Sequence, residues 1–200
     1  MSELDELYRA YAESIKTRDI DADLLHPVFG EGPNNATLML IGEAPGANEA
    51  EQSRAFVGKA GKQLDAFLVA VGLRREQIFI TNAVKYRPYK NEGKKNRTPT
   101  RQELDEGCEL LMHEIALVRP RVIATLGNSS LYAVTGDRKL TIGVVHGTVR
   151  AFSLNKQNIM LFPLYHPASV IYNPTLSQVY EQDLCKLKIL IEQLDHFDDK

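Results

Sequence analysis

Three short aliphatic runs, each ending near a glycine or a polar residue, constrain the fold of this chain more than any other feature. They are TLMLIG (37–42), QIFITNAV (77–84) and RVIATLG (121–127). Runs of this length that are bounded by turn residues are typical of strands buried in a sheet. Segments with apolar residues at helical spacing separate the runs, which favours parallel strands joined by crossover helices.

The remaining elements follow from periodicity and capping residues. We expect helices at 2–16, 58–71, 100–118 and about 176–194, a short helix from Asn128, and further strands at 147–153 and 158–165. Gly72 ends the second helix as a C-cap, and Thr100 with Glu103 forms a capping box at the start of the third. The pattern predicts one α/β domain over residues 1–200, a three-layer α/β/α sandwich with a mostly parallel central sheet.

The composition excludes several classes of protein. Hydrophobic residues make up 44% and charged residues 25% of the chain, the proportions of a soluble globular protein. No run approaches the ~18 apolar residues of a membrane span, and the polar N-terminus is unlike a signal peptide. Cys108 and Cys185 lie too far apart in the sequence to suggest a disulfide framework or a metal site. We therefore expect a cytoplasmic protein that does not associate with membranes.

Positive charge is concentrated in one segment, although the chain has a formal net charge of −2. Between Lys85 and Arg101 there are seven basic residues and one acidic residue, Glu92. A basic loop on an acidic body is typical of a phosphate-binding surface. A loop that is merely solvated has the same composition, so this segment alone leaves both interpretations open.

Polar residues follow four of the expected strands. Glu43 follows the first strand, Asn82 lies at the end of the second, Asn128 follows the third, and His166 follows a late strand. Because parallel strands bring their carboxyl ends to one edge of a sheet, we expect these residues to meet in one crevice. Taken singly, each also has a purely structural interpretation, such as a turn acid for Glu43 or a surface histidine for His166.

Six linked motifs extend this interpretation. GEAPGANE, AFVGKAGKQLD, TNAVKYRP, NRTPT, RPRVIATLG and YHPAS occur in the order and spacing of the uracil-DNA glycosylase superfamily. The chain most resembles the family-four branch, over roughly residues 26 to 190. The resemblance implies an enzyme of base excision repair that hydrolyses the N-glycosidic bond of flipped-out deoxyuridine. Its implied partner is uracil-containing DNA, and the enzyme is expected to be a monomer without a cofactor.

The resemblance assigns the binding of the base to six residues, five of which belong to the first three motifs. Phe56 would stack on the flipped uracil. Asn82 would read the uracil edge, because its amide offers an acceptor for N3–H and a donor for O4. Backbone N–H groups of Gly42, Glu43 and Ala44 would hold uracil O2, and the small, stiff turn that follows lets the backbone approach the base.

The resemblance also implies which residues carry the bond cleavage. His166 would stabilise the negative charge that develops on uracil O2, and it would also bind the base. The best-known branch of the superfamily has an aspartate where this chain has Ala44. Steadying the sugar cation and orienting the water would then fall to Glu43, with Glu49 as a second candidate.

DNA contacts are expected outside the base site. Residues after His166 resemble a loop that wedges into the duplex, with Val170, Ile171 and Tyr172 as apolar wedges, although they could instead begin the packing of the last helix. Phosphates would be bound by the basic loop and by a helix N-terminus. The expected DNA-binding residues are Lys85, Arg87, Lys94, Lys95, Arg97, Asn128, Ser129, Ser169, Val170 and Ile171.

Two departures from the relatives limit what the resemblance implies. Family-four enzymes usually hold an iron–sulfur cluster on four cysteines. Here their Lys-Cys-Arg-Pro is KYRP, with Tyr86, and the CxxC of the N-terminal helix is missing, so we expect no metal and packing around Tyr86 instead. The basic loop resembles an insertion in uracil-crosslinking relatives, but Asn96 replaces their nucleophilic histidine, which favours hydrolytic turnover.

Two other functional classes are consistent with parts of the sequence. A DNA-binding relative that recognises uracil or other lesions without cleaving them would share the base site, and it is the main alternative. An unrelated nucleotide-binding α/β domain would be expected to carry a phosphate loop, but the pattern GxxxxGK[ST] is absent. Release of uracil from DNA separates the first alternative from an enzyme.

Overall fold

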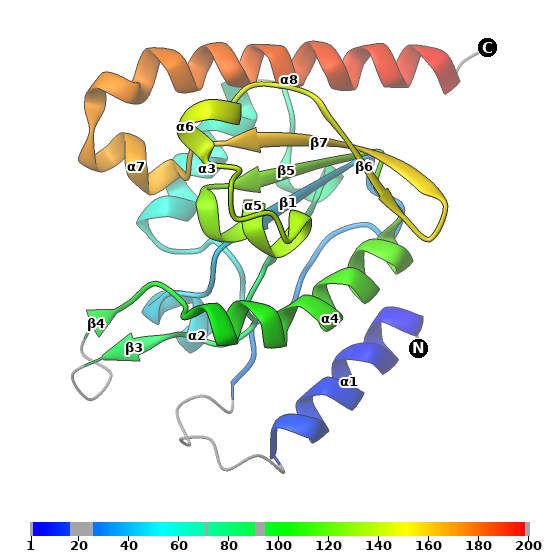
Figure 1. The fold of residues 1–200 in the computed structure, drawn as a ribbon, viewed down its shortest axis with the longest axis vertical. Helices are drawn as coiled ribbons and strands as arrows, with labels where there is room; N and C mark the ends of the chain where they lie inside the picture. The colour runs from blue at the N-terminus through cyan, green and yellow to red at the C-terminus, as the bar shows by residue number, and fades with distance from the viewer. Residues whose placement is uncertain (1, 17–25, 71, 91–94, 199–200) are drawn as a thin grey trace.

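The computed structural model describes residues 2–16, 26–70, 72–90 and 95–198 (Figure 1). Its α-helices are α1 (Glu3–Lys16), α2 (Ala47–Gln52), α3 (Lys59–Ala70), α4 (Arg101–Val118), α5 (Asn128–Thr135), α6 (Ile142–Val145), α7 (Pro167–Tyr172) and α8 (Ser177–Asp198). Its strands are β1 (Leu38–Gly42), β2 (Phe79–Asn82), β3 (Tyr89–Lys90), β4 (Lys95–Asn96), β5 (Val122–Leu126), β6 (Arg150–Leu154) and β7 (Gln157–Leu164). Two 3-10 turns are η2 (Arg75–Gln77) and η3 (Pro174–Leu176).

A five-stranded sheet with the order β2-β1-β5-β7-β6 lies at the centre of the fold. The first four of these strands run parallel, and β6 pairs antiparallel with β7. In the register, Gly42 lies opposite Asn82, and Leu126 lies opposite Leu164. The four parallel strands therefore end at one edge of the sheet, as the sequence predicts for the candidate site.

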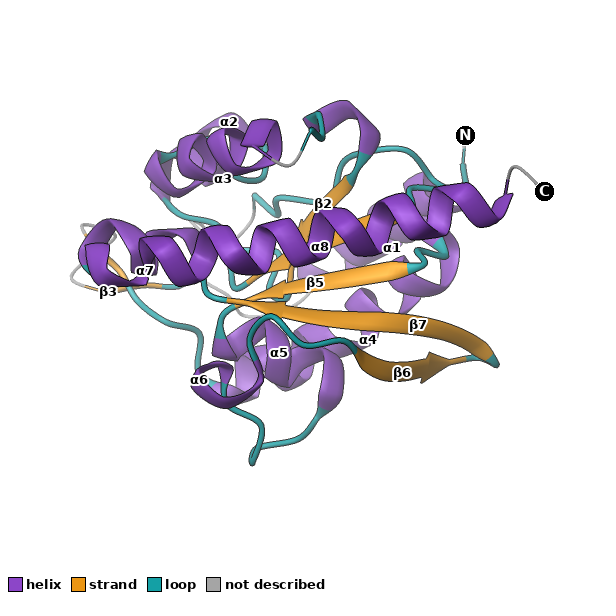
Figure 2. Cartoon of the chain, turned by 90° about the horizontal axis from the view of Figure 1, so that it is seen from above, coloured by secondary structure: helices purple, strands orange, loops and turns teal. Residues whose placement is uncertain are grey.

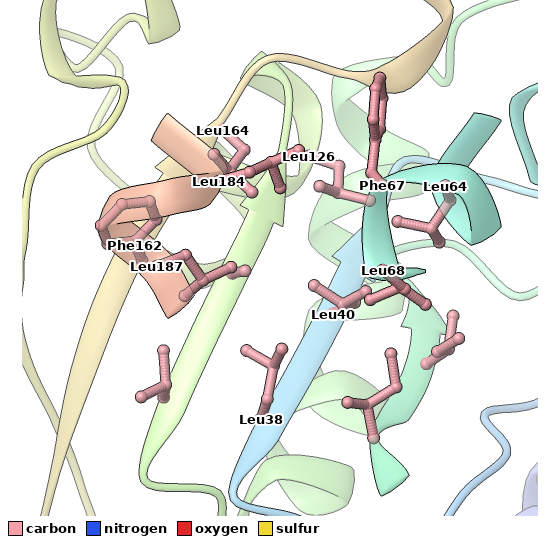
Figure 3. Close-up of a cluster of buried hydrophobic side chains, with 14 of the residues drawn as sticks. Leu38, Leu40, Leu64, Phe67, Leu68, Leu126, Phe162, Leu164, Leu184 and Leu187 are labelled. Carbon is pink, nitrogen blue, oxygen red and sulfur yellow. The ribbon is translucent and has the colours of Figure 1, made fainter. Parts of the chain in front are cut away.

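Helices cover both faces of this sheet because successive strand residues point to opposite sides. Leu38 and Leu40 of β1 pack with residues of α3 and α8 in one apolar cluster (Figure 3). Their neighbours Met39 and Ile41 belong to a second cluster, with residues of α1, α4 and α5. Figure 2 shows α8 lying along the first face. This arrangement confirms the predicted three-layer α/β/α fold with a mostly parallel sheet.

The predicted caps explain where two of the helices begin and end. Thr100 Oγ1 accepts a hydrogen bond from Glu103 N, and a Glu103 carboxylate oxygen accepts one from Thr100 N at 2.6 Å. Gly72 has φ of 74° and donates its N–H to Val69 O, which closes α3 as a left-handed C-cap. Position 71, the predicted end of α3, lies outside the described residues.

The sequence did not predict the shortest elements. These are α2, α6, α7 and the two-stranded β3–β4 hairpin. Helices of four to six residues complete too few turns to show a hydrophobic period, so periodicity could not reveal them. Within the described ranges, no helix has the length and apolar character needed to cross a membrane.

Candidate active site

The candidate site is built around Gly42, the last residue of β1. A Cβ atom placed on Gly42 would lie 2.4 Å from Asn82 Oδ1 and 2.5 Å from Cζ of the Phe56 ring. The side chains of Asn82 and Phe56 therefore meet directly above the glycine Cα, and both residues are buried. Only glycine leaves room for this approach, so the close packing explains the residue type at position 42.

Asn82 presents a side-chain amide that has no protein partner among the described residues. The residue ends β2 and is 2% exposed, and within the described parts of the chain no group hydrogen-bonds to this amide. Its backbone carbonyl, by contrast, accepts a hydrogen bond of 2.6 Å from the Lys85 ammonium. A fixed backbone with an uncommitted amide suits a residue that recognises a ligand through donor and acceptor atoms.

Phe56 is held in an unusual backbone conformation by Arg75. Its φ of 54° lies in the left-handed region, which bulky residues rarely adopt. The Arg75 guanidinium donates to the carbonyl oxygens of Ala55 and Phe56, the latter at 2.9 Å, and forms a salt bridge with Glu31 at 2.9 Å. Gly61 of α3 contributes as well, because a Cβ there would overlap the Phe56 carbonyl. The surroundings thus hold the Phe56 ring in the site.

His166 joins these residues from the end of β7. Its Nδ1 accepts a hydrogen bond of 3.1 Å from Ala168 N, so the imidazole is the N-cap of α7 and the neutral ring carries its proton on Nε2. Burial lowers the pKa of His166 to about 4, which keeps the ring neutral near pH 7. The ring lies 6.2 Å from the Phe56 ring, centroid to centroid. The site therefore contains a neutral imidazole N–H donor.

Glu43 is an acid in a partly desolvated environment. Burial raises the pKa of its carboxyl group above the ordinary value, and a hydrogen bond from Ser129 acts in the opposite direction. Ser129 Oγ donates this bond to Glu43 Oε2 over 2.6 Å. Ser129 lies in the first turn of α5, which follows β5. A side chain just after β5 therefore orients the acid that follows β1. The role of Ser129 towards Glu43 was not predicted from the sequence.

Glu49, the second candidate acid, is used by the loop that carries Phe56. Its carboxylate accepts hydrogen bonds from the backbone N–H groups of Gly46, Val57 and Gly58 at 3.1, 3.1 and 2.7 Å. These bonds tie the start of α2 to the segment before α3. A carboxylate with three backbone donors has a structural role here, which leaves Glu43 as the candidate for orienting water.

The prediction of a DNA contact is wrong for two residues, Lys85 and Val170. Lys85 is fully buried, and its ammonium contacts Glu114 at 2.5 Å, so it cannot reach a phosphate. Val170 is 8% exposed and packs in the apolar cluster beneath α7. Val170 thus packs into the core from α7, a short helix that precedes the last helix, α8. Its neighbours Ile171 and Tyr172 are 43% and 86% exposed.

The other predicted DNA contacts are partly engaged within the protein. Arg97 forms two hydrogen bonds of 2.7 Å with the Glu103 carboxylate, which raises the pKa of the guanidinium. Asn128 Oδ1 accepts a hydrogen bond from Ile142 N. Arg87 donates to the side chain of Asn96, which lies against Gly46. Lys95 is exposed, Ser169 is half-buried, and Lys94 lies outside the described residues.

The cysteines do not fit a four-cysteine iron–sulfur cluster. The chain has only Cys108 and Cys185, which lie on α4 and α8, on opposite faces of the sheet. Cys108 Sγ is 3.6 Å from Ala133 O, and Cys185 is exposed. In the described residues, no three histidine, cysteine, aspartate or glutamate side chains gather as metal ligands. No chemical step is therefore assigned to a metal.

The chain is similar in sequence to proteins of known families. The sequence profile of the uracil DNA glycosylase superfamily matches residues 29–192. A type-4 uracil-DNA glycosylase of Sulfurisphaera tokodaii is 38% identical over 167 residues, which cover 82% of this chain and 74% of that protein. One from Archaeoglobus fulgidus is 34% identical over 190 residues, 94% and 92% of the two chains. A DNA polymerase of Bacillus phage SP01 is 30% identical over 167 residues, 83% of this chain and 17% of the polymerase.

Proposed function

Because the chain belongs to the uracil DNA glycosylase superfamily, we propose that it is a uracil-DNA glycosylase of base excision repair. It hydrolyses the N-glycosidic bond of deoxyuridine in DNA, releases uracil and leaves an abasic site. The convergence of Gly42, Phe56, Asn82 and His166 at one sheet edge is the observation that supports this proposal most strongly. A flipped base needs a stacking face, an edge reader and a donor for its carbonyl oxygen, and these residues offer all three.

Recognition of uracil depends on the side-chain amide of Asn82. Its Oδ1 would accept from uracil N3–H, and its Nδ2 would donate to uracil O4. Cytosine presents the opposite pattern, and a mispaired buried amide costs about 1–3 kcal/mol. The Phe56 ring, held by Arg75, would stack on the base, and the glycine at position 42 lets the turn approach its edge.

Bond cleavage separates charge between the sugar and the base. The bond between C1′ and uracil N1 breaks, its electron pair leaves with uracil, and a cation-like sugar remains. The negative charge spreads onto uracil O2, where the backbone N–H groups of residues 42–44 and Nε2–H of neutral His166 would stabilise it. His166 donates a hydrogen bond in this step and need not transfer its proton.

Glu43 would complete the hydrolysis. Its carboxylate stabilises the sugar cation and accepts a proton from the water whose oxygen bonds to C1′. Ser129 holds one carboxylate oxygen, so the other remains for the water. Ala44 supplies no acid of its own, and the carboxylate of Glu49 is bound by the loop before α3.

The DNA would lie over the carboxyl ends of the parallel strands. We expect Arg87 and Lys95 of the basic segment to contact phosphates, with Ile171 and Tyr172 replacing the flipped base in the stack. We also propose that residues 1–200 form one domain and that the protein is cytoplasmic. It would act as a monomer, because the sheet edge of one chain is sufficient to bind DNA.

An alkali-scission assay tests the function directly. The protein is incubated with an oligonucleotide that contains one uracil, abasic sites are cleaved with alkali, and a thymine oligonucleotide serves as the blank. We expect scission at the uracil alone, with rates about 10²–10³ lower for His166→Ala and Asn82→Ala. His113→Ala, which removes an exposed histidine of α4, is the matched control and should retain activity. Binding without scission at any enzyme excess would instead identify a non-catalytic DNA-binding protein.

A further inference from the structure

A buried polar cluster lies directly behind Asn82. The Lys85 ammonium contacts Thr81 Oγ1 at 2.7 Å and Glu114 Oε2 at 2.5 Å, and Tyr8 OH donates to Glu114 Oε1 at 2.7 Å. Lys85 and Glu114 are both 0% exposed. Removing two charges from water is costly, and a buried ion pair is weak evidence of a gain in stability. A gain in stability therefore does not by itself account for this pair.

Lys85 is connected to the candidate site through two peptide groups. Its Nζ donates to the carbonyl oxygen of Asn82 at 2.6 Å. The N–H of the same peptide group, on Ala83, donates to the carbonyl oxygen of Gly42 at 2.9 Å. The Gly42 carbonyl in turn shares its peptide group with the N–H of Glu43. The relay therefore begins at a buried cation and ends at one of the donors proposed for uracil O2.

Hydrogen bonds in such a series strengthen one another. A peptide whose carbonyl accepts a strong bond becomes a better donor at its N–H, and the low dielectric of the interior increases the effect. We propose that Lys85 is a positioning residue that polarises this relay, so that the Glu43 N–H stabilises the negative charge developing on the departing base. This inference rests on the proposed glycosylase activity and assigns Lys85 a role in the leaving-group step.

The position of Glu114 is consistent with this role. Burial lowers the pKa of the Lys85 amine, whereas Glu114 acts in the opposite direction and favours the ammonium. The carboxylate belongs to α4, so the pair reaches from that helix to the end of β2. Lys85 contacts the Asn82 carbonyl directly, whereas Glu114 is connected to it only through Lys85. The positive member of the pair therefore lies nearer to the relay than the negative member.

The leaving group provides the test. Single-turnover rates are measured for release of uracil and of 5-fluorouracil from otherwise identical oligonucleotides. Fluorine withdraws electrons, so 5-fluorouracil leaves more readily and depends less on stabilisation of its negative charge. In Lys85→Met we expect uracil release to slow on the order of tenfold, less than the 10²–10³ for loss of a whole oxyanion donor. Release of 5-fluorouracil should slow less. The ratio of the 5-fluorouracil rate to the uracil rate should therefore rise about threefold or more.

Two further variants separate polarisation from structural damage. Lys85→Met/Glu114→Leu leaves no unpaired buried charge, and apolar replacement of a buried pair is often tolerated. It should show the same raised ratio, and it replaces the single variant if that one does not fold. Tyr8→Phe removes a hydrogen bond to Glu114 but keeps the contact between Lys85 and Asn82, so its ratio should equal that of the wild type.

The outcomes are distinct. Both rates come from the same preparation, so their ratio does not depend on the fraction of folded enzyme. An equal fall for both bases, or a wild-type ratio in the double variant, would overturn the role of Lys85 in polarisation. Failure of the wild-type protein to release either base would refute the proposed glycosylase activity itself.

Discussion

Replacing Gly42 by alanine tests the central geometry of the site. The new Cβ would lie 2.4 Å from Asn82 Oδ1 and 2.5 Å from the Phe56 ring, about 1 Å closer than ordinary contact. Gly42 does not have a positive φ, so alanine adds no backbone strain. The two side chains must therefore move by about 1 Å, an overpacking that costs about 1–3 kcal/mol of stability. A displacement of 1 Å in a catalytic site lowers rates about 10²-fold, so activity should fall even though the protein remains folded.

The assay compares single-turnover release of uracil with the free energy of unfolding in urea. Gly143→Ala is the matched control, because a Cβ on this glycine of α6 would meet no atom within 4 Å outside its own helix and chain neighbours. It should leave the rate unchanged and raise the free energy of unfolding by at most about 1 kcal/mol. Gly42→Ala should remain folded and lose about two orders of magnitude in rate. Wild-type activity in this variant would show that Asn82 and Phe56 do not act together above Gly42, and the reasoning about the site would fail.

Three further variants test the neighbouring contacts. Ser129→Ala removes a bond that lowers the pKa of Glu43, so the acid limb of the pH–rate profile should move to higher pH, because the proposed role of Glu43 requires its carboxylate form; an unmoved limb would contradict this. The depressed pKa of His166 means that the unfolded chain binds more protons between pH 6.5 and 4, so the unfolding free energy should fall by at most about 3 kcal/mol as pH drops through this window. Urea titrations should show a flatter dependence for His166→Gln. Arg75→Met should release the strained Phe56 loop, with a loss of about 1–3 kcal/mol in urea unfolding and slower uracil release; an unchanged rate would exclude positioning by Arg75.

The sequence predicted the sheet and the edge that carries the site. Buried strands between amphipathic helices leave few topologies, and parallel strands must end together. The expected meeting of Glu43, Asn82 and His166 at strand ends followed from this rule. The observed register places Asn82 beside Gly42, and a Cβ on Gly127 would lie 3.4 Å from His166 Cβ. Backbone direction was therefore sufficient to locate these residues without any knowledge of side-chain contacts.

The directions of side chains beyond the strand ends could not be predicted. Lys85 lies in a basic stretch, which suggests solvent, but Glu114, 29 residues further along the chain, makes it half of a buried pair. The carboxylate of Glu49 could orient water or cap a loop, and only the position of the residues before α3 decides between them. Val170 shares the buried side of α7 with Pro167, but a helix of six residues is too short for this spacing to show in the sequence.

The N-terminal helix is attached by aromatic packing and by a hydrogen bond to the buried ion pair. Tyr8 of α1 stacks on Phe29, with ring centroids 4.3 Å apart, and its hydroxyl donates to Glu114. Tyr86, where family-four enzymes have a cysteine, is buried in the apolar cluster shared by α1 and α4. Aromatic packing and the hydrogen bond to Glu114 thus hold α1 against α4. Because the same pair reaches the Asn82 carbonyl through Lys85, the attachment of α1 and the placement of Asn82, the residue proposed to read uracil, depend on one set of contacts.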